Sequence, residues 1–408
     1  MNLYLLVIIV IILLDWILDL FKYRAILSSL SPLVPDEFKD MVDAEEYRKN
    51  QNYTRKRVIF KKLKNYWGLL ETVLILSLGL FGILNRFVTG ISDSIYIQGI
   101  LFWAVFTVIE TVIGIPWSIY ETFVIEEEFG LNKTTPKTFV TDIIKQQLLF
   151  AVIGTPILMF MIYFFTNVAL AWLWIWAGLT LFMLLSALLV QDIIMPLFNK
   201  FSPLDEGELK DRIMSFAKVQ NVKLKGIYKM DGSRRSTVGN AYFGGLGKSK
   251  RIVLYDTLIE QLSPDEIVAV LAHEIGHNKL KHIPKGIAMS IINILIMVGF
   301  VGIFIGEPQF YAVFGIEGSP VYAGLALVFY LFPPIMLVTS MLSSYFSRIH
   351  EYEADAFAKA KTGDAPALIS GLKKLYLNAK SNLTPPRIEV VLKYSHPPIL
   401  DRIKALKG

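Results

Sequence analysis

The sequence contains no cysteine, only five histidines and few charged residues for its length. Without cysteine no disulfide can support the fold, which fits a reducing compartment. Asp, Glu, Lys and Arg make up 19% of the 408 residues, whereas apolar residues make up 54%, and mean hydropathy is +0.49. This composition is too apolar for a soluble protein of this length and indicates a membrane protein.

Long apolar runs recur along the chain. They lie at about 3–21, 66–84, 98–120, 147–166, 169–190, 286–306 and 320–345. Each run is close to the ~20 residues with which a helix crosses a bilayer. The first run is predicted to be a retained helix rather than a signal peptide, because it lacks a basic start and contains Asp15 and Asp19. The fourth and fifth runs are almost contiguous and predict a tight helical hairpin.

Basic residues are distributed unevenly between these runs. Segment 22–65 carries eleven Lys or Arg, segment 85–97 only Arg86, and segment 307–319 none. Segment 196–285 and the tail after 346 are rich in Lys. By the positive-inside rule, seven spans place the N-terminus outside and the long basic segments in the cytoplasm. Nucleic acid is not an expected partner, since the basic segments lack a recognisable binding module.

Residues 273–277 read His-Glu-x-x-His. On a helix, His273 and His277 lie on the same face and can coordinate one metal ion, while Glu274 can reach a water bound to that metal. This pattern is typical of zinc hydrolases, usually peptidases. Ser263-Pro264-Asp265-Glu266 predicts a capping box at the start of this helix. The helix must end or kink by Pro284.

A catalytic zinc site needs a third protein ligand. In one peptidase class a Gly and then a His follow the second motif His, but Leu280 and Ile283 occupy those positions here. His282 lies five residues beyond His277, about 140° around a continuous helix. His282 is therefore expected to point away from the metal and to be a solvated residue near the helix end.

The acidic segment after residue 350 offers better candidates for the third ligand. Glu351 and Asp355 are four residues apart on a predicted helix, so one can bind the metal while the other holds a ligand histidine. Periodicity alone does not separate Glu351 from Glu353. The motif helix ends just before the apolar run 286–306, and Glu351 follows closely on the run 320–345, which predicts a metal near the cytoplasmic membrane surface.

The soluble part is predicted to be small. Residues 205–219 predict an amphipathic helix, and the predicted strands lie at 223–229, 239–244 and 251–256. The edge strand is expected to carry Asn240, Ala241, Tyr242 and Phe243, and a peptide substrate can add to it as a further strand. Gly244-Gly245 and Gly247-Lys248 predict a turn and lack the spacing of a phosphate loop.

Polar residues also occur inside the apolar runs. They are Asp15, Asp19, Glu110, Gln191, Asp192 and Asn293. Such residues normally face a bundle interior or a wet cavity. Hydrogen bonding between helices explains any one of them, but their spread over several spans favours an aqueous cavity. Pro116 and Pro333-Pro334 predict kinks in the third and seventh spans.

Several motifs together resemble one known family. The His-Glu-x-x-His motif and Glu351-Tyr352-x-Ala354-Asp355-Ala356-Phe357-Ala358 are similar to motifs of the type 1 CaaX prenyl proteases, which are integral-membrane zinc metalloproteases. Further similar segments are Ile125–Asn132, Asn240–Gly244, Lys250–Leu258 and Tyr394–Pro398 with Arg402. The resemblance covers most of the chain from about residue 65 to 408.

The resemblance implies a set of roles for residues of this chain. It implies Zn²⁺ held by His273, His277 and Glu351, with Glu274 as general base. It places Asp355 behind the ligands, and His396 and Arg402 in the lining of the active site. The implied fold is mainly α, with seven transmembrane helices around a large intramembrane chamber. A small α+β zincin-like catalytic domain is expected on the cytoplasmic side.

The predicted organisation has four parts. They are transmembrane helices one to five (1–200), the catalytic domain (201–284), helices six and seven (285–346) and a C-terminal helical segment (347–408). The expected substrate is a peptide or protein, either a prenylated CaaX C-terminus or a misfolded membrane protein. A monomer in the lipid bilayer is expected, and a prokaryotic cytoplasmic membrane is favoured over the endoplasmic reticulum.

Two alternative functions compete with this one. A membrane heat-shock metalloprotease shares both motifs but usually has fewer spans. A transporter-like scaffold with structural zinc requires a closed site with four protein ligands, and Glu274 argues for chemistry instead.

Overall fold

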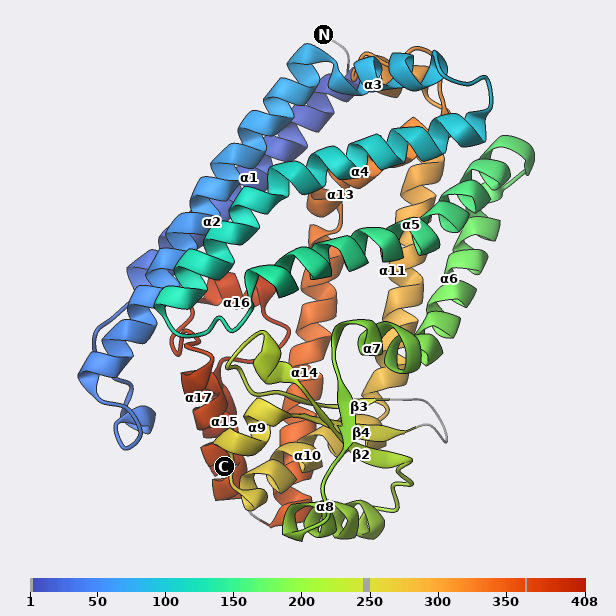
Figure 1. The fold of residues 1–408 in the computed structure, drawn as a ribbon. Coiled ribbons are helices and arrows are strands. Elements are labelled where there is room, and N and C mark those ends of the chain that lie inside the picture. Colours follow the sequence, from blue (N-terminus) through green and yellow to red (C-terminus); the bar gives the residue numbers. More distant parts are fainter. Residues whose placement is uncertain (1–2, 245–249, 364) are drawn as a thin grey trace.

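Long helices make up most of the computed structural model, which describes residues 3–244, 250–363 and 365–408. Most of the long helices gather at one end of the molecule, a small domain with a β-sheet occupies the other, and α14 extends into that domain beside α10 (Figure 1). The long helices are α1 Leu3–Ser29, α2 Ala44–Leu78, α3 Leu80–Thr89, α4 Ile95–Tyr120, α5 Pro136–Asn167, α6 Ala171–Leu189, α11 His282–Phe304, α13 Val321–Ile335 and α14 Leu337–Thr362. Each of the seven apolar runs therefore falls on helix.

Helix length and composition leave the predicted number of seven spans untested. Among the described residues, four helices are long and apolar enough to cross a membrane: α1, α4 with its extension to Glu126, α5 and α11. Two bent pairs raise the number to as many as six: α2 with α3, at 55°, and α6 with Val190–Phe198, at 51°. The seventh run is divided at Met336, two residues after Pro334, and α13 continues through both prolines to Ile335.

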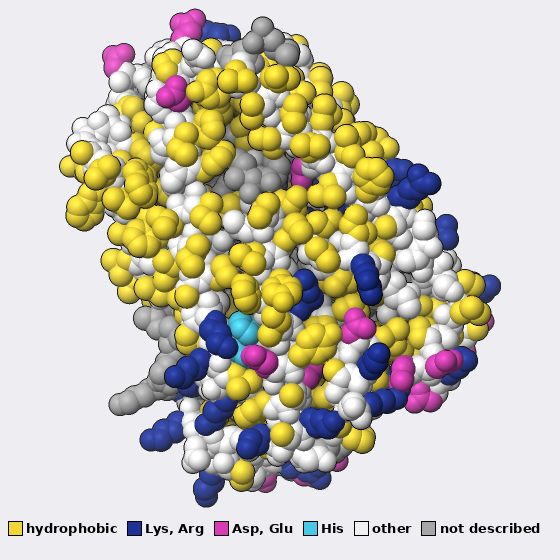
Figure 2. Space-filling model, turned by 180° about the vertical axis from the view of Figure 1, so that it is seen from behind, with side chains coloured by type: hydrophobic (Ala, Val, Ile, Leu, Met, Phe, Trp, Pro, Cys, Tyr) yellow, Lys and Arg dark blue, Asp and Glu magenta, His cyan; other side chains and the backbone are white. Residues whose placement is uncertain are grey.

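Apolar side chains cover the outside of the helical end. Leu14, Val112, Val152 and Ile303 are each at least 60% exposed. Figure 2 shows hydrophobic side chains over most of this region, while charged side chains gather towards the end that carries the sheet. Such a surface is unfavourable in water and matches the hydrocarbon of a bilayer. The molecule is thus a multi-pass membrane protein.

Helices α5 and α6 form the predicted tight hairpin. Three residues connect them, and Leu170 adopts a left-handed conformation with φ 54°. A Cβ atom at Gly178 would meet the ring of Phe160, so the absence of a side chain on α6 lets the two helices pack closely.

The small domain combines a four-stranded sheet with short helices. The strands are β1 Phe201–Pro203, β2 Gly226–Met230, β3 Ala241–Gly244 and β4 Arg251–Tyr255, in the order β1-β2-β4-β3. Strands β2 and β4 are parallel and the other pairs antiparallel. The three predicted strands are confirmed, and β3 lies at an edge as expected. Strand β1 was not predicted, because it is three residues long and contains Pro203. The turn predicted at Gly245 to Lys248 lies outside the described residues.

The motif helix is the centre of this domain. The domain's helices are α8 Glu208–Val219, α9 Asp256–Gln261, α10 Pro264–Lys279, α15 Ala365–Asn378, α16 Arg387–Lys393 and α17 Ile399–Lys407. Leu271, Ala272 and Ile275 of α10 are at most 1% exposed, in a core shared with the sheet and the C-terminal helices. Burial of this apolar stripe fixes the rotation of the motif helix.

The predicted capping box of α10 is confirmed. The Ser263 backbone N–H donates to the Glu266 carboxylate (2.7 Å), and the Glu266 N–H donates to Ser263 Oγ (3.4 Å). The Glu266 carboxylate also accepts hydrogen bonds from Ser370 and Lys374 of α15. The first turn of α10 is therefore tied to the C-terminal helices as well as capped.

Two of the polar residues predicted to face a wet cavity have another role. Gln191 and Asp192 accept hydrogen bonds from Arg251 of β4, at 2.9 and 2.7 Å. Asp15 and Asp19 each line a pocket, of about 310 and 490 Å³. The partner of Gln191 and Asp192 is thus a cation from the sheet, about 60 residues away in sequence.

The α2–α3 bend is held by contact with the segment after α12 (Pro308–Ala312). The Gly82 N–H donates to the Phe314 carbonyl (3.1 Å), and a Cβ atom on Gly82 would overlap the Gly315 carbonyl oxygen. Backbone cannot move aside as a flexible side chain can, so this position requires glycine.

We predict that Gly82→Ala lowers stability by about 1–3 kcal/mol, the usual cost of overpacking. The matched control is Gly299→Ala in α11, where a Cβ atom meets nothing within 4 Å. The control is expected to stay within about 1 kcal/mol of the wild type. Thermal unfolding of the purified proteins in detergent measures both. Equal melting temperatures for the two variants would contradict the proposed close approach.

Candidate active site

Two helices supply the candidate metal ligands. Helix α10 carries His273 and His277, and α14 carries Glu351. The two helices approach closely at Gly276, where a Cβ atom would lie 3.1 Å from Phe357 and 3.3 Å from Ala354. The glycine in the motif thus allows Glu351 to reach the two histidines.

The three side chains converge on one point. His273 Nε2 lies 3.1 Å from His277 Nε2 and 3.3 Å from Glu351 Oε2, and His277 Nε2 lies 3.2 Å from Glu351 Oε1. Ligand atoms at zinc distances in a tetrahedral site lie roughly 3.3 Å apart. Glu351 is almost fully buried, so a bound cation would balance a carboxylate that water hardly reaches. The donor set therefore fits a zinc ion.

Asp355 and Arg402 lie behind His273. His273 Nδ1 is 2.8 Å from Asp355 Oδ1, which fixes the ring so that Nε2 faces the other ligands. Arg402 donates to both oxygens of Asp355, from Nε (2.8 Å) and Nη2 (2.7 Å). Asp355 and Arg402 are 2% and 4% exposed, so the guanidinium neutralises a carboxylate that water does not reach.

The pKa values of these groups follow from burial and pairing. Burial lowers the pKa of His273, but hydrogen bonds to Asp355 and Glu351 outweigh it and raise the pKa to about 9. Burial raises the pKa of Glu351, but the hydrogen bonds from His273 and His277 hold it well below its usual range. Glu351 is therefore a carboxylate at neutral pH, the form that binds a metal.

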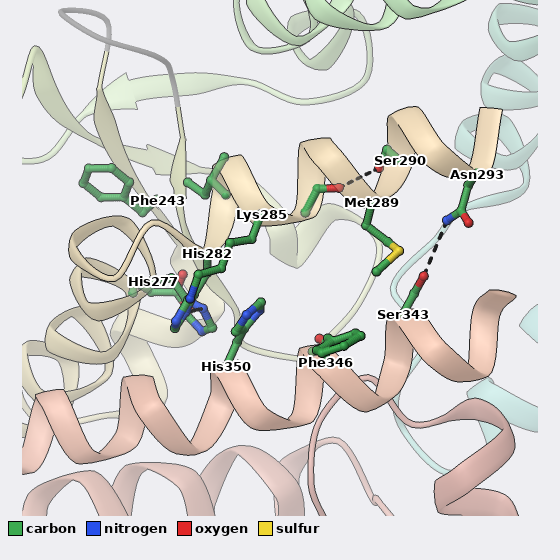
Figure 3. A pocket seen from close by; sticks show the side chains of 14 residues that line it. Phe243, His277, His282, Lys285, Met289, Ser290, Asn293, Ser343, Phe346 and His350 are labelled. Atoms are coloured by element: carbon green, nitrogen blue, oxygen red, sulfur yellow. Dashed lines mark hydrogen bonds between the residues drawn. The ribbon is translucent and has the colours of Figure 1, made fainter. Parts of the chain in front are cut away.

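Glu274 lines a cavity of about 680 Å³, and Figure 3 shows other residues of its wall. The wall of this cavity also includes His277, Phe243 of β3, Met289 of α11 and Phe346 of α14. Burial raises the pKa of Glu274, against the opposing effect of His273 and His277. A carboxylate with a raised pKa is suited to take and release a proton near neutral pH.

His396 and Arg402 take up different positions at the site. His396 Nε2 lies 3.4 Å from Glu351 Oε1, and the His396 side chain is 58% exposed. Arg402 Nη1 lies 3.5 Å from Glu351 Oε2, but the Arg402 side chain is almost fully buried. The two residues therefore differ in burial, a difference that the sequence did not reveal.

The four predicted substrate-binding residues lie on or beside the edge strand. Phe243 lines the cavity, and its backbone hydrogen-bonds to the Glu274 carboxylate. The Tyr242 hydroxyl instead contacts Met195 Sδ (3.2 Å), and the Asn240 side chain accepts from the Ala241 N–H (2.8 Å). Of the four residues, Phe243 is thus the one that contacts the proposed general base Glu274 and the cavity.

The prediction that His282 is solvated and points away was wrong. His282 is 6% exposed, and its Nδ1 lies 3.0 Å from His277 Nδ1. Helix α10 ends at Lys279, and Lys281 has φ 59°, so α11 starts anew at His282 in another direction. The rotation expected for a continuous helix therefore does not apply.

His350 is a site residue that the sequence did not reveal. Its ring stacks on that of His282, with centroids 4.1 Å apart and planes 12° apart. His282 Nε2 also lies 2.8 Å from Glu353 Oε2. The only available signal was that four of the five histidines fall within 273–350.

The comparisons with known proteins cover both parts of the chain. Residues 22–200 match the family model described as CAAX prenyl protease N-terminal, five membrane helices. Residues 203–408 match peptidase family M48.

Similar proteins include CAAX prenyl protease 1 of Saccharomyces cerevisiae, 33% identical, covering 94% of this chain and 90% of that protein. The Homo sapiens homologue of CAAX prenyl protease 1 is also 33% identical, over 92% of this chain and 88% of its own. The crystal structure of S. mikatae Ste24p matches with a TM-score of 0.91 and 32% identity, covering 99% of both chains. The chain therefore belongs to peptidase family M48 and is a membrane metalloendopeptidase of the CAAX prenyl protease type.

Proposed function

We propose that the chain hydrolyses peptide bonds with a zinc ion held by His273, His277 and Glu351. The observation that carries this assignment is the convergence of three donor atoms 3.1 to 3.3 Å apart, with Glu274 beside them at a cavity. Within the described residues, the metal-binding group around His273 has three members. Three protein ligands leave a coordination position open, which is typical of a catalytic rather than a structural site.

In the proposed reaction, zinc acts as a Lewis acid and the protein transfers the proton. Bound zinc supplies a Lewis acid and lowers the pKa of water towards about 7. Glu274 accepts the proton of the attacking water and passes it to the leaving amine. Its side chain can do both because it borders the cavity in which a scissile bond would lie.

Asp355, Arg402 and His396 are proposed to support this reaction differently. Arg402 is buried against Asp355, so it acts by positioning Asp355 and, through it, His273. His396 is exposed beside Glu351, where it can donate a hydrogen bond to a substrate carbonyl or carboxylate. All of these groups come from one chain, so a monomer suffices.

We propose a prenylated CaaX C-terminus as the substrate. The curated relatives carry the name CAAX prenyl protease. The cavity joins the polar groups Glu274 and His277 to an apolar wall that includes Met289 and Phe346. A peptide attached to a lipid presents the same combination. The edge strand β3 offers its backbone to the peptide part.

The proposed topology places the active site in the cytoplasm. The N-terminus and α3 lie at the end of the molecule opposite the sheet (Figure 1). Segment 85–97 carries one basic residue, whereas the domain with the sheet is rich in Lys. The positive-inside rule then puts the sheet in the cytoplasm and the N-terminus outside. A prokaryotic cytoplasmic membrane stays a prediction from the sequence.

We predict that Glu274→Gln retains zinc while its rate of cleavage falls about 10²–10⁴-fold, as for loss of a general base. The assay uses a farnesylated CaaX peptide beside an unprenylated membrane-protein fragment, with product masses as the readout. The wild type is expected to cleave the farnesylated peptide faster. Retained cleavage by Glu274→Gln would overturn the mechanism, and faster cleavage of the unprenylated fragment would favour a quality-control substrate.

The topology is testable because the chain contains no cysteine. In intact cells, Asp93→Cys is expected to react with a membrane-impermeant maleimide, since residue 93 lies in the segment assigned to the outside. Lys218→Cys on α8 should react only after permeabilisation. Both positions are exposed on the protein, so burial does not protect either. The reverse labelling pattern would invert the proposed orientation.

A further inference from the structure

A second group of metal-binding side chains adjoins the proposed zinc centre. His282 at the start of α11 and His350 and Glu353 on α14 place their potential ligand atoms within 4.8 Å of one another. Figure 3 shows the His282 and His350 side chains pointing towards each other beside His277. None of these three residues has a part in the proposed peptidase mechanism.

The two nitrogens of His282 face different neighbours. Nδ1 lies 3.0 Å from His277 Nδ1, on the side of the proposed zinc centre. Nε2 lies 2.8 Å from Glu353 Oε2, on the side of the second group. The His350 ring stacks on His282 at a centroid distance of 4.1 Å. Because these rings are stacked nearly parallel, their in-plane lone pairs run side by side, and the His350 ring has to turn for one of its nitrogens to meet Nε2 of His282 and the Glu353 carboxylate on one ion.

The second group is less tightly arranged than the first. Its donors spread over up to 4.8 Å, whereas those of the first lie 3.1 to 3.3 Å apart. The Glu353 side chain is 46% exposed, so it can adjust. The ammonium of Lys285 lies 4.0 Å from Glu353 and opposes a cation there. A metal would thus bind here more weakly than at the first group.

We propose that His282, His350 and Glu353 form a second, weaker site for a divalent transition metal such as Zn²⁺, and that its occupation inhibits the peptidase. Two imidazoles and a carboxylate are a ligand set that zinc accepts. The inference rests on the proposed function in one respect: that His277 binds the catalytic zinc through Nε2.

Proton placement makes the two sites antagonistic. When His277 Nε2 is a metal ligand, its proton resides on Nδ1 and is donated to His282 Nδ1. A metal on His282 Nε2 moves the His282 proton to Nδ1. Two N–H groups then face each other across 3.0 Å and repel. Filling the second site therefore costs the hydrogen bond that orients His277.

The position of the second site also favours inhibition of the peptidase. His282 and His350 line the 680 Å³ cavity that Glu274 and His277 also line. A bound ion and its waters would occupy space beside the proposed position of the scissile bond. Both effects lower the rate of cleavage when zinc is in excess.

The test is a zinc titration of the metal-stripped, full-length protein in detergent. Calorimetry and elemental analysis after desalting give the zinc bound per chain, and cleavage is measured at each point. The wild type should bind two zinc ions, with cleavage highest after the first and falling as the second binds. Glu353→Gln and His350→Phe should keep the first ion, lose the second and escape inhibition over the same zinc range.

The Lys285→Gln variant tests the proposal in the opposite direction. It is expected to bind the second zinc ion more tightly, a result that a misfolded protein would not give. Removing the ammonium beside Glu353 should tighten binding of the second ion, measured by calorimetry. The proposal is overturned by a wild type that binds one zinc only, by variants that keep the second ion, or by a second ion that leaves cleavage unchanged. Failure of the proposed function looks different: the first ion itself would then bind without Glu351 or fail to support cleavage.

Discussion

The close approach of α10 and α14 at Gly276 is the constraint on which the active site depends. A side chain at this position would push against Ala354 and Phe357, and Glu351 would no longer lie within 3.3 Å of both motif histidines. The capping box and the hydrogen bonds from α15 hold α10, while α14 packs against α10 and the C-terminal helices α16 and α17. The proposed metal site therefore depends on the packing of α14 against the small domain.

Charge balance is the second requirement of this buried site. Glu351 and Asp355 are two carboxylates four residues apart on α14, both almost inaccessible to water. The guanidinium of Arg402, near the C-terminus, pairs with Asp355 and approaches Glu351. A bound cation would balance the remaining charge. The C-terminal helix α17 is thus part of the active site, although it is the most distant element in sequence.

Local patterns in the sequence predicted most of the fold that surrounds the site. The motif helix, its capping box, three strands and the α5–α6 hairpin follow from residues close together in the chain, where spacing and capping chemistry decide the structure. The position of His282 could not be predicted, because it depends on the left-handed backbone at Lys281. The same holds for Gln191 and Asp192, whose partner Arg251 is brought to them by tertiary packing alone. Spacing also left Glu351 and Glu353 equivalent, although the fold directs them to different histidines.

The most direct test of the account is the zinc content of Glu351→Ala beside its neighbour Glu353→Ala, measured at one equivalent of zinc per chain. Both variants remove a carboxylate from the same helix, two residues apart. The geometry predicts that Glu353→Ala retains zinc as the wild type does, while Glu351→Ala loses it. Zinc retained by Glu351→Ala and lost by Glu353→Ala would contradict the proposed metal centre.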